Sequence, residues 1–122
     1  MSCVRTIKTF EVVEIKLDEN VSCVFSQGSA NNEPAYYDSG SAVRMYQNGA
    51  ILDVKASNGK TIKEIELTFG SNMFYLDADA GQLSPESPVR VWTGDAAAVK
   101  FTATGTDKNH RAYVAAIKVS YE

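Results

Sequence analysis

The sequence predicts an all-β protein, an antiparallel β-sandwich of about eight or nine short strands, to which a jelly roll and an immunoglobulin-like sandwich both fit. Apolar residues recur at alternate positions along nearly the whole chain, as they do in strands with one buried face. Turn sequences separate these runs every 8 to 12 residues or so. No stretch of about eleven residues keeps the i, i+3, i+4, i+7 apolar spacing of an amphipathic helix.

The expected strands follow one another with short gaps. The last is the clearest: Tyr113, Ala115, Ile117, Val119 and Tyr121 alternate with Val114, Ala116, Lys118 and Ser120. The other expected strands are marked by Val13, Ile15 and Leu17; Val21, Cys23 and Phe25; Val43 and Met45; Leu52, Val54 and Ala56; Ile65, Leu67 and Phe69; Val89 and Val91; and Val99 and Phe101.

Two kinds of connection are expected between these strands. Asn48 before Gly49 and Asn58 before Gly59 are suited to two-residue hairpin turns, because both residue types tolerate a positive φ. Residues 26–34 and 77–88 contain glycine, proline and small polar residues and are predicted to be loops. Loops of this length on a rigid β scaffold are places where binding often occurs.

Length, composition and charge restrict the class of protein. A chain of 122 residues with 44% hydrophobic and 22% charged residues fits one globular domain over residues 1–122. The net charge of −3 argues against nucleic acid as a partner, because phosphate binding needs a basic face. No apolar stretch reaches the ~18 residues of a membrane span. Residues 1–17 contain no basic segment followed by an apolar one, so no secretory signal is expected.

Metal and disulfide chemistry receive little support. Cys3 and Cys23 could form a bridge if their Cα atoms lay within about 7 Å, but without an export signal two reduced thiols are favoured, with Cys23 in the core. No Cys-x-x-Cys pair suggests zinc. The spacing of Asp77, Asp79 and Gly81 resembles the start of a calcium loop, but the twelfth position is Pro88 instead of an acid. We therefore predict no metal and no cofactor.

Catalysis is not expected either. The single histidine, His110, lies in a polar turn, and the chain has no Gly-x-Ser-x-Gly sequence to hold a nucleophile. Glu64 and Glu66 lie two residues apart on the polar face of a strand, where carboxylates are normally solvated. We predict that the protein is not an enzyme, and a small hydrolase is the least favoured function.

Aromatic and polar residues give the candidate ligand site. Neighbouring tyrosines on a strand point to opposite faces, so one of each pair should point outward. An outward aromatic surface beside amide or guanidinium groups would suit a sugar ring. The alternative is that the tryptophan and one tyrosine of each pair belong to the core. Arg90 could add a polar contact but is more simply a solvated strand residue. The candidate site residues are Tyr36, Tyr37, Arg44, Tyr46, Asn31, Asn32 and Trp92.

Several segments together resemble a small β-sandwich module found, often at the C-terminus, in secreted nucleases and lipoproteins of anaerobic gut bacteria. The similarity runs over about residues 22–121. It implies a jelly-roll-like fold similar to carbohydrate-binding modules and supplies no catalytic residues. The segments that carry it are 25–29 (FSQGS), 34–40 (PAYYDSG), 42–46 (AVRMY), 60–69 (KTIKEIELTF), 92–94 (WTG), 99–102 (VKFT) and 111–121 (RAYVAAIKVSY).

Two functions follow as expectations. The first is a phage virion-surface protein, a capsid-decorating or fibre-associated module, which binds a capsid or fibre protein and presents a weak glycan-binding face. Release by lysis would explain why no export signal is expected. Its docking surface would be an exposed apolar patch or an edge strand. The second is a carbohydrate-binding accessory domain of a secreted enzyme or lipoprotein, at the cell surface or outside the cell.

Overall fold

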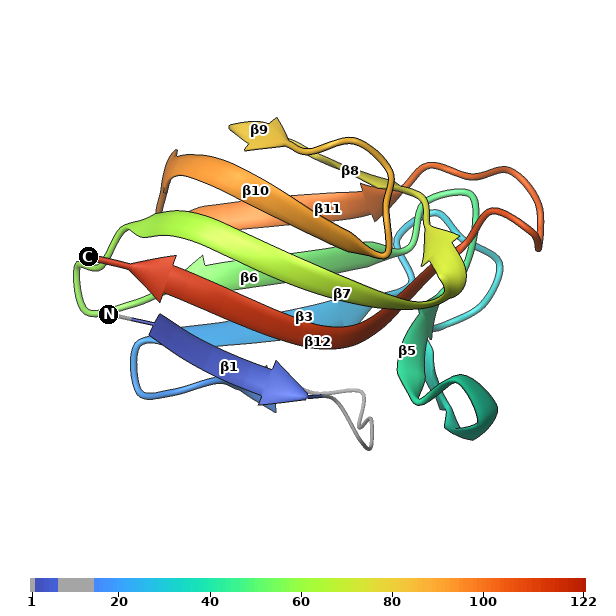
Figure 1. The fold of residues 1–122 in the computed structure, drawn as a ribbon, viewed down its shortest axis with the longest axis horizontal. Helices are drawn as coiled ribbons and strands as arrows, with labels where there is room; N and C mark the ends of the chain where they lie inside the picture. Colours follow the sequence, from blue (N-terminus) through green and yellow to red (C-terminus); the bar gives the residue numbers. More distant parts are fainter. Residues whose placement is uncertain (1, 7–14) are drawn as a thin grey trace.

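The computed structural model describes residues 2–6 and 15–122 and confirms the β-sandwich. Two antiparallel sheets pack face to face, as the two layers in Figure 1 show. The larger sheet has the order β4 (Ala35–Tyr37), β5 (Ala42–Met45), β12 (Ala112–Tyr121), β7 (Ile62–Phe74), β10 (Val89–Ala96) and β9 (Gln82–Leu83), with β1 (Ser2–Thr6) also paired to β12. The smaller sheet has the order β2 (Ile15–Lys16), β3 (Val21–Ser26), β6 (Ile51–Ala56), β11 (Ala98–Ala103) and β8 (Leu76–Ala78).

The structure has twelve strands in its described residues rather than eight or nine. The additional ones are β1, β4, β8 and β9, each of five residues or fewer. Part of β8 and all of β9 fall within 77–88, which was wrongly expected to be loop throughout. These segments carry no clear alternation of their own, but β11 and β10 offer them edges to pair with. The loop expected at 26–34 is confirmed apart from Ser26, which ends β3.

The chain crosses repeatedly between the two sheets, as in a jelly roll. Both Asn-Gly turns are crossing points: Asn48 and Gly49 have φ of 67° and 115°, and Asn58 and Gly59 have φ of 57° and 74°. The positive φ values confirm the prediction for these residues, but the predicted hairpins are wrong. β5 and β6, and likewise β6 and β7, lie in opposite sheets. Local turn chemistry fixed the backbone conformation, and burial of the flanking strands decided which partners they took.

Strand β12 organises the larger sheet. One of its edges pairs with β7 along its length, while β5 and β1 share the other edge in succession (Figure 1). The pairing with β7 shifts register between Val114 and Ala116, and such a bulge changes which side chains face inward. Ala112 and Val114 are buried in the core before the shift, and Ile117 is buried after it. The uninterrupted alternation expected from Tyr113 to Tyr121 is therefore wrong at its start.

The core fills the space between the sheets. Its largest members are Trp92, Tyr121, Phe25, Phe101 and Met45, each with at most 2% of its surface exposed. Cys23 lies in this core, as expected, and Cys3 is half-buried on β1; the two are not joined by a disulfide. Of the expected first strand, only β2 is seen, and Val13 lies outside the described residues. The described part of the chain has no helix long and apolar enough to cross a membrane.

Candidate functional site

A group of arginine and tyrosine side chains lies on the outer face of the larger sheet, where β4, β5 and β12 meet. Arg44 on β5 is paired with Ala35 on β4 and with Tyr113 on β12. Residues paired across strands share a face, and Val43 and Met45 on either side of Arg44 point into the core. Arg44 and Tyr113 consequently point away from the core, toward the outer surface.

Close contacts join five side chains on this face, which we call the Arg–Tyr patch: Tyr37, Arg44, Tyr46, Arg111 and Tyr113. The guanidinium carbon of Arg44 lies 4.1 Å from the centre of the Tyr37 ring, 5.1 Å from that of Tyr113 and 5.8 Å from that of Tyr46. The Tyr37 and Tyr113 ring centres are 5.8 Å apart. A cation over several aromatic faces is held electrostatically.

Arg44 is half-buried, and its Nε atom is buried with no hydrogen-bond partner among the described residues. Burial alone lowers the pKa of Arg44, but a hydrogen bond with the Tyr46 side chain and the nearby phenols raise it, and the net direction is upward. The guanidinium is therefore charged at every physiological pH. Tyr113 lies beneath it and is only 6% exposed.

A second guanidinium completes the patch from the start of β12. The guanidinium carbon of Arg111 lies 4.6 Å from the centre of the Tyr46 ring. Its Nε donates a hydrogen bond of 2.7 Å to Oε1 of Gln47, which fixes the direction of the side chain. Arg111, Gln47 and Tyr46 are all half-buried, so each retains a surface that a ligand can contact.

The predicted site residues do not all come together in the structure. Tyr37, Arg44 and Tyr46 are brought together in the patch. Tyr36 is paired with the core residue Val43 and packs against the core. Of the two neighbouring tyrosines, Tyr37 is therefore the one that points outward. Asn31 and Asn32 are exposed on the loop before β4, and no contact in the described structure links them to the patch.

Trp92 does not belong to a surface site. Its side chain is fully buried, and the indole Nε1 donates a hydrogen bond of 2.6 Å to the Ala80 carbonyl oxygen. Arg90 is also buried, with 7% of its surface exposed, rather than solvated. Both residues lie on the inner face of β10. Alternation shows that they share a face of the strand, but it does not show whether that face is the inner or the outer one.

Sequence reasoning left three contributors out of the site: Tyr113, Arg111 and Gln47. Tyr113 alternates in the sequence with the positions of Ile117 and Val119, and the bulge in β12 that separates it from them has no clear sequence signal. Arg111 and Gln47 precede and follow strands, where alternation does not apply. The pattern Arg44-Met45-Tyr46 opposite Arg111-Ala112-Tyr113 would have suggested the patch only after the two strands were known to pair.

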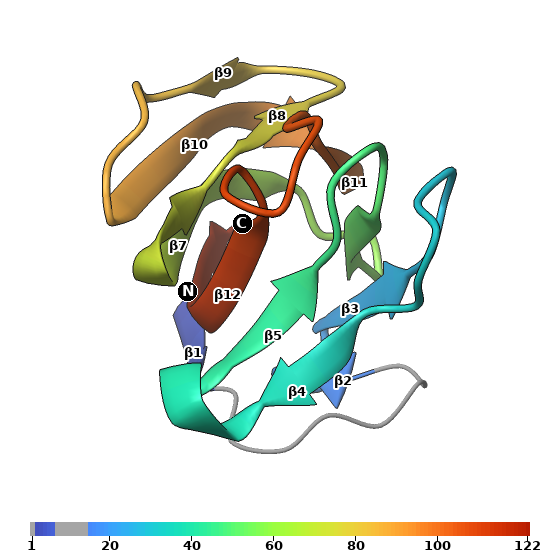
Figure 2. The ribbon, with the colours of Figure 1, turned by 90° about the vertical axis from the view of Figure 1, so that its right-hand side faces the viewer.

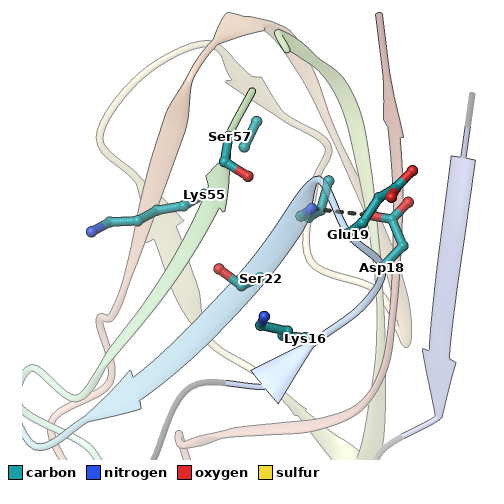
Figure 3. Close-up of a pocket in the computed structure, with 8 residues that line it drawn as sticks. Lys16, Asp18, Glu19, Ser22, Lys55 and Ser57 are labelled. Atoms are coloured by element: carbon teal, nitrogen blue, oxygen red, sulfur yellow. Dashed lines mark hydrogen bonds between the residues drawn. The ribbon is translucent and has the colours of Figure 1, made fainter. Parts of the chain in front are cut away.

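The smaller sheet carries a separate pocket of about 260 Å³ beside the turn between β2 and β3 (Figure 3). Its carboxylate Asp18 already accepts hydrogen bonds from the backbone N–H groups of Asn20 and Val21 and from the Tyr121 hydroxyl. Lys55 extends away from Lys16 and Ser22 in Figure 3. The pocket is lined by Lys16, Asp18, Glu19, Val21, Ser22, Lys55, Ala56 and Ser57. Its polar groups do not converge on one point, so the patch is the stronger candidate.

The features considered for chemistry lie apart from the patch or serve the fold. His110 is exposed, its Nδ1 lies 2.7 Å from Oδ1 of Asp107, and its ring meets Tyr75 edge-on at 4.8 Å. Asp107 also accepts a hydrogen bond from the Asn109 backbone N–H, so these contacts stabilise the turn. Over residues 2–6 and 15–122, no three histidine, cysteine or acidic side chains are grouped so that they could hold a metal.

The chain matches no known family model, and no curated protein matches it by sequence.

Proposed function

We propose that this protein is a non-catalytic interaction module that binds a glycan through the Arg–Tyr patch. The observation that carries the proposal is the stacking of Arg44 on the outward-pointing Tyr37, 4.1 Å from the ring centre, with Tyr46 and Arg111 alongside. Such a surface offers apolar ring faces and hydrogen-bond donors side by side, which are the two contacts that a sugar needs.

The patch is suited to recognition because its parts are already in place. Tyr37, Arg44 and Tyr113 lie on paired strands, and strands hold side chains more rigidly than loops do. The contacts among the rings and guanidinium groups further restrict their rotamers. A ligand would therefore bind with little loss of side-chain entropy. A patch of five side chains favours weak binding to one or two sugar units.

A non-catalytic role fits the groups that surround the patch. The patch itself contains guanidinium and phenol groups, which bind and orient but do not supply an activated nucleophile with its base. His110, the only histidine of the chain, has its Nδ1 directed at Asp107 in a surface turn.

The setting in which the module acts is a second part of the proposal. A position on the virion surface of a phage, next to a capsid or fibre protein, remains the first prediction; an accessory domain of a secreted enzyme or lipoprotein is the alternative. For docking on a capsid or fibre protein, the exposed large apolar side chains of the described residues are Val4 and Val89. They lie on different strands, β1 and β10. Mass spectrometry of purified virions against secreted fractions distinguishes the two settings.

A glycan array with purified protein tests the binding function. The variants Tyr37→Ala and Arg44→Ala remove the two faces of the stack, and Lys100→Ala, which removes an exposed cation from the smaller sheet, is the matched control. We expect the control to keep the wild-type binding profile and both patch variants to lose it. Thermal unfolding of all four proteins establishes that the variants are folded. Binding retained by both folded patch variants would reject the proposed site.

A further inference from the structure

The two arginines of the patch have no anionic partner within the described structure. The ion pairs seen there join Lys63 to Asp95 and Glu122, and His110 to Asp107. Arg44 is surrounded by neutral phenols, and the Nε of Arg111 donates to the neutral amide of Gln47. Two guanidinium groups beside the same Tyr46 ring therefore have no acidic side chain paired with them in the described structure, on a protein whose net charge is −3.

This arrangement is costly in the absence of a ligand. A partly buried charge loses solvation, and it is normally paired or fully hydrogen-bonded for that reason. The Nε of Arg44 is withdrawn from water without an acceptor. Contacts with aromatic rings recover only part of this loss, about 0.5–2 kcal/mol for each ring at most sites. A surface with these properties is prepared for an anion.

Tyr46 connects the two charges. Its ring centre lies 5.8 Å from the guanidinium carbon of Arg44 and 4.6 Å from that of Arg111. A planar anion close to this ring could accept hydrogen bonds from both guanidinium groups, and carboxylates match guanidinium geometry particularly well. The half-buried rings of Tyr37 and Tyr46 keep some exposed surface on which a sugar ring would pack.

We infer that the ligand of the Arg–Tyr patch is an acidic sugar, whose carboxylate is bound by Arg44 and Arg111 while its ring packs on the adjacent tyrosines. This inference rests on the proposed function and specifies the chemical class of its ligand. Hexuronates and sialic acids have the required chemistry. Sulfated sugars and free carboxylates share the negative charge, and the experiment separates them.

The test is an NMR titration of the full ¹⁵N-labelled chain with methyl glycosides at millimolar concentration. The acidic probes are the methyl glycosides of glucuronate, galacturonate and N-acetylneuraminate. Methyl glucoside and methyl galactoside are the neutral counterparts, methyl galactoside 6-sulfate tests a sulfate group, and sodium acetate tests the bare carboxylate. We expect at least one acidic sugar to shift the Arg44 and Arg111 Nε–H signals and the amides of β5 and β12, with the other probes about tenfold weaker or inactive.

Arg44→Gln and Arg111→Gln should each weaken binding of the acidic sugar at least about tenfold, because each removes a charge-assisted hydrogen bond. Lys100→Gln serves as the charge control and should leave the affinity within about twofold. Added salt should weaken binding by the wild type, because the contact is ionic and close to the surface.

The outcomes separate the two proposals. Neutral and acidic sugars that bind the patch equally would overturn the acidic ligand and keep the glycan site. Acetate or the sulfated sugar binding as well as the best acidic sugar would also overturn it, because the site would then recognise charge without the carboxylated ring. If no sugar of any class shifts the patch signals and the glycan array is negative, both proposals fail.

Discussion

The hydroxyl of Tyr121 donates a hydrogen bond of 2.6 Å to Oδ2 of Asp18. The amide of Asn20 donates to the same hydroxyl at 3.2 Å, and the Asn58 amide donates to Oδ1 of Asn20 at 2.8 Å. These bonds tie the end of β12 in the larger sheet to the turns beside β3 and β6 in the smaller one. Figure 2 looks at the sandwich from one end, with β12 and β7 in one layer and β3 and β11 in the other.

Replacing Tyr121 by phenylalanine should destabilise the protein without changing its fold. The ring still fills the core, but the carboxylate of Asp18 and the amide of Asn20 each lose a partner. Hydrogen bonds to charged groups contribute more than neutral ones, so we expect the melting temperature to fall by about 5 °C or more. Fluorescence of the single tryptophan, Trp92, follows the unfolding because that side chain is fully buried. A melting temperature equal to that of the wild type would contradict the role given to this bond.

The same network should make stability depend on pH. The hydrogen bond from Tyr121, with further bonds from the Asn20 and Val21 backbone N–H groups, lowers the pKa of Asp18 below its ordinary value. A carboxyl whose pKa is lower in the folded state stabilises the protein above its unfolded pKa, and this contribution disappears as the pH falls through the folded pKa. We expect the stability advantage of the wild type over Asp18→Asn to be complete at pH 6 and to shrink below about pH 4. Urea unfolding at several pH values measures it, and an advantage that grows toward low pH would contradict the assignment.

Arg90 should be required for the path of the chain between the sheets. Its Nη1 donates to the carbonyl oxygens of Phe74 at 2.9 Å and Leu76 at 2.8 Å, and its Nε donates to that of Ser84 at 3.0 Å. Burial lowers the pKa of this guanidinium, but three carbonyl acceptors hold it in place. Arg90→Met leaves these carbonyls without a donor, so the free energy of unfolding should fall by about 3 kcal/mol.

The part of the protein that is destabilised in Arg90→Met identifies the cause of the lower stability. Hydrogen exchange in Arg90→Met should become faster in β8 and at Ser84, whose backbone the guanidinium holds, and remain slow in β3 and β6. Arg90→Lys keeps the charge but cannot make three directed bonds, so it should recover only part of the stability. If the methionine variant is as stable as the wild type, the guanidinium does not hold this connection.

The fold could be predicted because its main signal is local. Leu52 and Val54 alternate with polar neighbours on β6, and that alternation alone requires a strand with one buried face. The short strands β8 and β9 have no such pattern; they exist because β11 and β10 present open edges to them. The Asn-Gly turns likewise specified their backbone conformation but not the sheet to which the next strand would belong.

The site could be predicted only in part for the same reason. Tyr37 was identified because neighbouring tyrosines on a strand point to opposite faces, and Tyr46 and Arg44 were identified as a further aromatic ring and a polar group that could accompany it. Trp92 was a plausible member until its face was known, and it proved to be in the core. Tyr113 was missed because a bulge in β12 turns it outward. The face that each side chain takes depends on register between strands far apart in sequence, which no local pattern records.

Gly40 should control the orientation of Tyr37, and therefore ligand binding. A Cβ atom at this position would lie 2.7 Å from Cδ2 and 3.0 Å from Cε2 of the Tyr37 ring, which is closer than such atoms approach. The atoms that the new Cβ would meet first belong to a half-buried side chain and not to the backbone, so the ring can be displaced and Gly40→Ala should remain folded. The displaced ring would no longer lie under the Arg44 guanidinium, and affinity for the ligand should fall severalfold.

A double-mutant cycle isolates this effect, because residues in contact do not contribute independently. In the Tyr37→Ala background the added methyl group has no ring to displace, so Gly40→Ala should then leave the affinity unchanged. Binding is measured by NMR titration with the glycan that gives the strongest array signal. Additive losses in the double variant would mean that the methyl group acts on the backbone of the turn, and Gly40 would then have no specific role in placing Tyr37.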